Sequence, residues 1–204
     1  MTAGAMLWSC VVADLTNTAR VKRVLGIPAG MTLHDEYIGE LADVVDQLVL
    51  DYCGQPTLTW GSYTDKFDIE LQGQNEVMLP RFPVYEVTSV ADAEETLATT
   101  AWYLDQRTGA VRLTQAGASF TAGKQKVVVE YTAGHTASSP GLNTLAHAAS
   151  VWCSAMFNAG RHAGMSNEWM GSQYRYTLDA AGVPAPIRSM LAGYIRIIPR
   201  DSQP

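Results

Sequence analysis

Apolar residues recur at three- and four-residue steps in four stretches of the chain, and this spacing predicts four amphipathic helices. The first helix follows a cap at Thr16 or Asn17, and Gly26 can end it because glycine accepts a left-handed backbone. Thr32 begins the second helix. The predicted helices cover residues 17–25, 32–52, 140–160 and 187–198.

The second helix is expected to bury one face and to expose the other. Its apolar positions are Tyr37, Ile38, Leu41, Val44, Val45, Leu48, Val49 and Tyr52. The opposite face carries Glu36, Glu40 and Asp43, and no Lys or Arg occurs between His34 and Cys53. Like charges one turn apart repel mildly, so an uncompensated acidic face is unusual, although a solvated face is the simpler interpretation.

Between the second and third helices the pattern changes to alternation, which is typical of half-buried strands. Tyr63, Phe67, Ile69 and Leu71 share one face of the first such stretch. The predicted strands cover residues 63–71, 77–79, 83–90, 102–105, 110–113 and 126–132. Short strands joined by tight turns pair mainly antiparallel.

The sequence therefore predicts an α+β fold, in which helices flank a small, mainly antiparallel β-sheet and a C-terminal helix and tail follow. The 204 residues, of which 47% are apolar and 17% charged, suit one globular domain. Its expected parts are N-terminal helices (1–54), a β-rich middle (55–134) and a C-terminal helical region with a tail (140–204).

Composition and motifs argue against several classes of function. A net charge of -6 argues against a general nucleic-acid binder, and no apolar run reaches the roughly 18 residues of a membrane span. No phosphate loop, nucleophile elbow or metal-binding spacing occurs, so neither catalysis nor a cofactor is expected. The three cysteines form no CxxC pair and are expected to be small buried apolar residues.

One acidic loop keeps an enzymatic alternative open. Asp92, Glu94 and Glu95 lie between two predicted strands, and paired carboxylates can transfer protons or bind a cation. A bare acidic surface loop is the simpler interpretation.

Several short motifs follow one another in a characteristic order between Leu15 and Arg200. They are Val24-Leu-Gly-Ile27, Asp51-Tyr-Cys-Gly54, Leu79-Pro80 with Pro83-Val84, Tyr103-Leu-Asp105 with Gly109, Val129-Glu-Tyr-Thr-Ala-Gly134, Pro184-Ala-Pro-Ile-Arg188 and Tyr194-Ile-Arg196. In this order and spacing the chain resembles the head–tail connector (adaptor, or head-completion) proteins of tailed double-stranded DNA bacteriophages. The stretch from Gly164 to Gly182 and the apolar N-terminal extension depart from the pattern.

The resemblance implies a structural virion protein without catalytic activity. Such connectors form rings, commonly dodecamers, in the neck between the portal and a neck or tail-completion protein. DNA passes through the ring without sequence-specific binding. The resemblance also implies assembly in the host cytoplasm and no contact with a membrane.

Three groups of residues are candidates for these contacts. Glu36, Glu40 and Asp43 are expected to face the lumen or the arginines of a neighbouring subunit. The C-terminal candidates for portal docking are Arg188, Tyr194, Arg196, Ile197, Ile198 and Arg200. A loop that a partner would order contains Met165, Trp169, Met170 and Tyr174. Deletion of residues 194–204 is expected to spare folding and weaken portal attachment.

Other interpretations remain open at this stage. A tail-completion or terminator protein would bind the tail tube rather than the portal. A small cytosolic enzyme would show a pocket with converging polar groups near the acidic loop. A host-encoded interaction module would show neither a pocket nor self-association.

Overall fold

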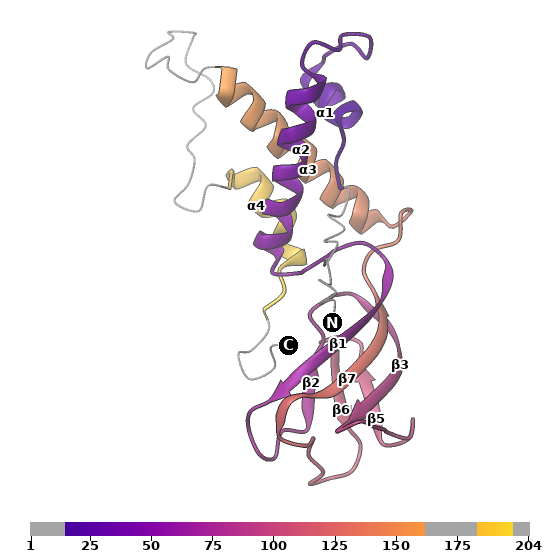
Figure 1. Ribbon diagram of the computed structural model, residues 1–204. Coiled ribbons are helices and arrows are strands. Elements are labelled where there is room, and N and C mark those ends of the chain that lie inside the picture. Colours follow the sequence, from indigo (N-terminus) through magenta and orange to yellow (C-terminus); the bar gives the residue numbers. More distant parts are fainter. Residues whose placement is uncertain (1–14, 162–182, 198–204) are drawn as a thin grey trace, which may run out of the picture.

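The computed structural model describes residues 15–161 and 183–197, which form an elongated molecule with a helical end and a β end (Figure 1). The helices are α1 (Thr18–Leu25), α2 (Asp35–Cys53), α3 (Pro140–Arg161) and α4 (Ala185–Leu191), and a 3-10 turn, η1 (Ala192–Tyr194), follows α4. None of the helices in the described ranges has the length and apolar character needed to cross a bilayer.

The first helix begins and ends as the sequence predicts. The side chain of Asn17 accepts a hydrogen bond from the backbone N–H of Arg20 at 3.0 Å, which caps one free donor of the first turn. Gly26 ends the helix with a φ of 69°.

The predicted start of α2 at Thr32 is wrong, because the helix begins three residues later at Asp35. The buried ammonium group of Lys22 explains the difference. It donates to the carbonyl oxygens of Ala29 and Met31 at 2.9 and 2.7 Å, and it pairs with the Asp35 carboxylate at 2.8 Å. The chain before Asp35 therefore wraps around Lys22 instead of forming a helical turn.

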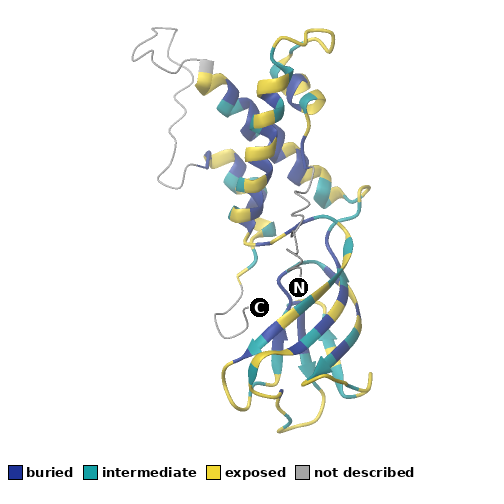
Figure 2. Ribbon diagram, viewed as in Figure 1, coloured by how far each residue is buried: buried dark blue, intermediate teal, exposed yellow. Residues whose placement is uncertain are grey.

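The helical end has its own hydrophobic core, in which α2, α3 and α4 contribute most of the side chains (Figure 2). The fully buried members include Ile38, Val45, Leu145, Phe157 and Leu191. The predicted apolar face of α2 is correct along most of its length, but Tyr37 and Val44 are 42% and 48% exposed.

The β end contains seven strands in two antiparallel sheets. The strands are β1 (Gly61–Ile69), β2 (Glu76–Met78), β3 (Val84–Asp92), β4 (Glu95–Thr96), β5 (Trp102–Asp105), β6 (Ala110–Leu113) and β7 (Gly123–Ala133). One sheet has the order β1-β7-β3-β4 and the other β2-β6-β5. The long strand β7 holds the first sheet together, because it pairs with β1 along one edge and with β3 along the other.

A second hydrophobic core lies between these sheets. Phe67 and Val129 come from the four-stranded sheet, and Val77 and Val111 come from the other. Strand β1 ends at Ile69, so Leu71 is 56% exposed rather than buried. The predicted α+β class with antiparallel pairing and a C-terminal helix is confirmed. The strands divide into two sheets, with the helices beyond one end of them (Figure 1).

The last helix is shorter than its apolar pattern predicts. The helical backbone stops at Tyr194, and residues 195–197 continue as a non-helical segment from the helical end towards the β end. The predicted continuation of this helix through residues 195–197 is therefore wrong. We call residues 195–197 the strap.

Candidate functional site

The outer face of α2 is acidic. Glu36, Glu40 and Asp43 are exposed on it, and none of them forms an ion pair within residues 15–161 and 183–197. The buried positions of α2, such as Ile38 and Val45, lie on the opposite side of the helix in the core with α3. The acidic side chains therefore point away from α3, and the exposed bands of α2 are visible in Figure 2.

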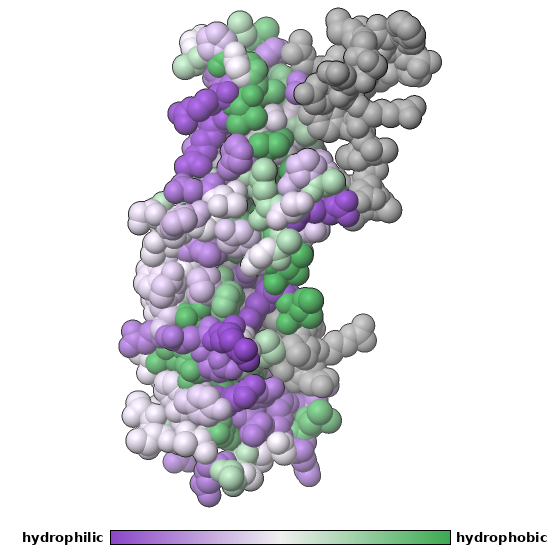
Figure 3. Space-filling model, turned by 180° about the vertical axis from the view of Figure 1, so that it is seen from behind, coloured by the Kyte–Doolittle hydropathy of each residue, from purple (hydrophilic) through white to green (hydrophobic). Residues whose placement is uncertain are grey.

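A basic groove lies between α1 and α3. It is lined by the capping residue Asn17, by Ala19, Arg20, Arg23 and Val24 of α1, and by His147 and Ser150 of α3. No Asp or Glu occurs in α1 or in α3, and the charged side chains that line the groove, Arg20 and Arg23, are both positive. From behind, a strip of hydrophilic surface over α1 adjoins hydrophobic surface of the helical end (Figure 3).

The strap joins the two ends of the molecule through Arg196. Its backbone N–H donates to the Cys53 carbonyl at 2.7 Å, where α2 ends. Its guanidinium crosses to the β end and donates to the carbonyls of Leu79 at 2.8 Å and Thr108 at 2.5 Å. The same group lies 5.0 Å from the centre of the Phe82 ring.

Burial lowers the pKa of the Arg196 guanidinium from its usual value. Because the ordinary pKa of arginine is far above neutral, the group stays charged, and the carbonyl oxygens around it take the place of water.

Gln55 makes a second connection at the same place. Its side-chain amide donates to the Tyr194 carbonyl at 3.0 Å and accepts from the Phe82 backbone N–H at 2.8 Å. Gln55 is only 5% exposed, so both bonds are shielded from water. One side chain therefore contacts both the end of η1 and the segment before β3.

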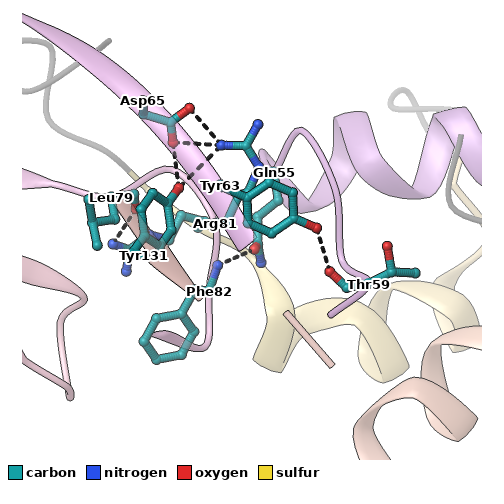
Figure 4. A network of polar contacts seen from close by, with 9 residues as sticks. Gln55, Thr59, Tyr63, Asp65, Leu79, Arg81, Phe82 and Tyr131 are labelled. Atoms are coloured by element: carbon teal, nitrogen blue, oxygen red, sulfur yellow. Dashed lines mark hydrogen bonds and ion pairs between the residues drawn. The ribbon is translucent and has the colours of Figure 1, made fainter. Parts of the chain in front are cut away.

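A polar network supports the segment that receives these contacts (Figure 4). The Arg81 guanidinium donates to both oxygens of Asp65, at 2.7 and 2.5 Å, and to the Tyr131 hydroxyl at 3.2 Å. The Tyr131 hydroxyl donates to Asp65 in turn. Arg81 also stacks 4.3 Å from the centre of the Tyr63 ring.

The titration behaviour of this network follows from its burial. Burial and the neighbouring Asp65 carboxylate raise the pKa of Tyr131 well above its ordinary value. Burial lowers the pKa of Arg81, but its hydrogen bonds with Asp65 and Tyr131 outweigh that effect and raise the pKa overall. Tyr131 therefore stays neutral and Arg81 stays charged at neutral pH, as suits a structural network rather than a proton relay.

The two chain connections between the ends run side by side. The Trp60 N–H donates to the His135 carbonyl at 3.0 Å, and the His135 N–H donates to the Leu58 carbonyl at 2.8 Å. Gly134 has a φ of 97°, and a Cβ atom added there would lie 2.1 Å from the Thr59 carbonyl oxygen. The close approach of these two segments therefore requires glycine at position 134.

The structure uses the predicted C-terminal candidates in different ways. Arg196 is engaged within the subunit, and the Tyr194 ring lies 5.5 Å from the ring of His135. Arg188 is half-buried, whereas Ile197 is 82% exposed. Of the predicted residues, Ile198, Arg200, Met165, Trp169, Met170 and Tyr174 lie outside the described ranges.

The acidic loop has a structural use. The Asp92 carboxylate accepts hydrogen bonds from the backbone N–H and the hydroxyl of Thr121, at 3.0 and 3.1 Å, while Glu94 and Glu95 are exposed. Within residues 15–161 and 183–197, no three His, Cys, Asp or Glu side chains lie close enough to hold a metal ion.

Sequence reasoning missed two features of the helical end. No residue of α1 was among the candidates, whereas Arg20 and Arg23 of α1 line the groove. The signal was present, because α1 contains three basic residues and no acid. The second feature is the buried Asp46, whose partners Leu15 and Thr16 are 31 and 30 residues away, so the helical spacing of apolar positions gives no sign of them.

Comparison with known proteins gives a fold but no sequence family. No protein-family model matches the chain, and no curated protein does. A chain of the virion of a native gene transfer agent (GTA) particle shares the fold, with a TM-score of 0.54 and 16% identity over 92% of this chain and 89% of that one.

Two chains from the GTA neck share the same fold. One is from the neck of the empty particle with C6 symmetry, with a TM-score of 0.52 and 16% identity over 92% of both chains. The other is from the neck of the native particle with C12 symmetry, with a TM-score of 0.53 and 14% identity, also over 92% of both chains. This chain therefore has the fold of GTA particle proteins along nearly its whole length.

Proposed function

We propose that this protein is a structural component of the neck of a tailed phage or of a phage-like particle. In this role it forms a ring below the portal, through which DNA passes and to which the neck or tail attaches. The observation that carries the proposal is the fold shared with GTA neck chains over 92% of both partners, which includes the helical end and the β end together.

The charged surfaces of the helical end support a ring subunit. Cyclic rings need two different complementary surfaces on each subunit. The helical end supplies an acidic face on α2 and a basic groove between α1 and α3. The acidic loop that would serve an enzyme instead holds the chain at Thr121 through Asp92.

The role also explains the charge of the chain. A protein around translocating DNA must not bind it tightly, and a net charge of -6 gives a net repulsion of phosphate. The exposed Ile197 at the end of the strap is a candidate contact for the portal, together with Ile198 and Arg200. Assembly is proposed to take place in the host cytoplasm.

Cryo-EM of particles from the producing strain tests this role. We expect density for this chain as a ring directly below the portal, with a hole wide enough for duplex DNA. A ring that contacts the tail tube instead would assign the chain to tail completion. Particles that lack the chain altogether, as judged by mass spectrometry, would contradict a neck role.

A further inference from the structure

Two exposed patches of the helical end carry opposite charge in the same spacing. On α1, Arg20 is followed by Arg23 and then by Val24. On α2, Glu40 is followed by Asp43 and then by Val44. Residues three and four apart share one face of a helix, so each set forms a compact patch of two like charges beside a valine. We call these the basic patch and the acidic patch.

Neither patch uses its charges inside the subunit. Within residues 15–161 and 183–197, no hydrogen bond or ion pair engages the charged groups of Arg20, Arg23, Glu40 or Asp43. The two valines are also incompletely covered, since Val24 is 41% and Val44 is 48% exposed. Each patch therefore offers both a charge and an apolar contact to a partner.

The patches lie on opposite sides of the helical end. The acidic patch is on the side of α2 that points away from α3, which lies behind α2 in Figure 1. The basic patch adjoins His147 on the exposed side of α3, across the bundle from α2. A subunit therefore cannot bring its own two patches together.

The placement of the two patches on opposite sides is the arrangement that a cyclic ring requires. A C12 ring, such as the symmetry of the native GTA neck, turns each subunit by about 30° from its neighbour. The two contact surfaces of one subunit must then point in nearly opposite directions. If the two complementary surfaces lay on the same side of the subunit, two copies could satisfy both surfaces at once and would form a closed dimer instead.

We propose that the acidic patch of one copy docks on the basic patch of the next copy, and that this contact repeats around the ring. This inference rests on the proposed function, because the contact is between identical subunits of a ring. Arg20 and Arg23 face Glu40 and Asp43 of the neighbour, and the two valines meet beside them. The exposed ring of Tyr37, next to the acidic patch, adds apolar area to the contact.

The charges fix the register of this contact, whereas the apolar side chains contribute the affinity. Opposite charges across an interface steer the encounter and exclude wrong partners, and like charges placed together repel. Reversal of one patch should therefore weaken self-association by about tenfold or more. Reversal of both patches in one chain restores opposite charges at every contact.

Four variants of the full chain test the contact. They are E40K/D43K, R20E/R23E, the combination of all four substitutions, and the control E94K/E95K. The control changes two exposed acids at the β end and has the same effect on net charge as E40K/D43K. Sedimentation velocity over a concentration series measures self-association, and thermal melting at low concentration checks the folding of each monomer.

We expect each single-patch variant to lose self-association, the combined variant to regain it, and the control to behave as the wild type. An equimolar mixture of E40K/D43K and R20E/R23E should also associate, because every contact then joins opposite charges. A wild-type ring that the single-patch variants still form would overturn this contact and leave the neck role standing. A wild-type chain that never self-associates, alone or on particles, would overturn both.

A further outcome would assign the basic patch differently. If R20E/R23E melted at a lower temperature as a monomer while self-associating normally, the occupant of the groove would be a segment of the same chain. That result would also overturn the contact between copies.

Discussion

Asp46 shows how one residue can decide the path of the chain into the first helix. Its carboxylate is 2% exposed and accepts hydrogen bonds from the backbone N–H groups of Leu15 and Thr16, at 2.8 and 3.3 Å. The Thr16 hydroxyl in turn lies 2.6 Å from the Ser150 hydroxyl of α3. These contacts tie the start of the described chain to both α2 and α3.

We predict that Asp46→Asn lowers the free energy of unfolding by about 1–3 kcal/mol. The substitution removes the charge from buried hydrogen bonds, and bonds to charged groups contribute about that much. Urea unfolding followed by circular dichroism measures the change. Asp51→Asn is the matched control, because Asp51 is an exposed acid on the same helix. Equal stability of the two variants would contradict the role of Asp46.

The two cysteines within the described ranges should be unreactive in the folded protein. Cys53 and Cys153 are fully buried, and burial raises the pKa of each thiol to about 11. Because the thiolate is the nucleophile, alkylation at pH 8 needs a form that is rare well below that pKa. We predict that iodoacetamide leaves both unmodified at pH 8 in native protein and labels both in urea, as mass spectrometry of peptides can show.

The sign of the pH dependence follows from the same shift. A thiol whose pKa is higher in the folded than in the unfolded protein makes its full contribution to the free energy of unfolding at a pH where it is protonated in both the folded and the unfolded protein. This contribution is lost as the pH rises through the ordinary thiol pKa towards 11, where the unfolded chain ionises first. Native labelling of either cysteine at pH 8 would show that its surroundings open without global unfolding.

At the level of elements, the spacing of apolar residues predicts that a helix or strand exists better than it predicts where that element begins and ends. The helices and most strands follow from apolar spacing, because each element buries one face in one of the two cores. The start of α2 depends on Lys22, which binds carbonyl groups outside any helix, and the strap after the last helix depends on Arg196, whose carbonyl partners are distant in the chain. Spacing along the sequence carries no information about such partners.

The candidate site also has one part that the sequence predicts and other parts that it does not. The acidic face of α2 is visible in the sequence, since its charges follow the helical period. The groove needs α1 and α3 to be neighbours, and Arg20 and His147 are far apart in the chain. Arg196 was assigned to an external partner because an arginine at the end of an apolar helix gives no sign of an internal one.

The strap changes the expected effect of a C-terminal deletion. Removal of residues 194–204 would take away Arg196 and the Tyr194 carbonyl that binds Gln55, so we expect the deletion to destabilise the fold, in contrast to the expectation from the sequence alone. We predict that the point variant Arg196→Lys lowers the free energy of unfolding by about 1–3 kcal/mol. A lysine ammonium cannot reproduce the planar set of donors to the Leu79 and Thr108 carbonyls.

Urea unfolding of Arg196→Lys and of Arg107→Lys separates this contribution from a general loss of arginine. Arg107 is exposed in the turn between β5 and β6, so its substitution should change stability by less than about 0.5 kcal/mol. Similar losses for the two variants would argue against a bridging role of Arg196.

At the scale of the whole molecule, two cores are joined by a small number of buried polar contacts. Gln55 and Arg196 supply most of the side-chain bonds between the helical end and the β end. We predict that the ends unfold together in the wild type and separately in the double variant Gln55→Ala/Arg196→Met. The double variant leaves each core intact and removes the bonds between them.

Hydrogen exchange in increasing urea can follow the two ends at once. In the wild type, amides of α3 and β7 should lose protection at the same urea concentration. In the double variant, the two midpoints should separate, whereas the surface control Gln47→Ala/Arg107→Met should keep them together. Separate midpoints in the wild type would show that the chain folds as two units rather than as the single domain predicted from the sequence.

The three segments that cross between the ends have a mechanical consequence. Backbone hydrogen bonds link residues 54–60 to residues 134–139, and the Arg196 N–H of the strap donates to the Cys53 carbonyl at the end of α2. A single tether would let one end swivel, and two would let it hinge about the line between them. Three tethers hold it against twisting and bending alike, so a load applied to one end reaches the other as displacement of the whole subunit.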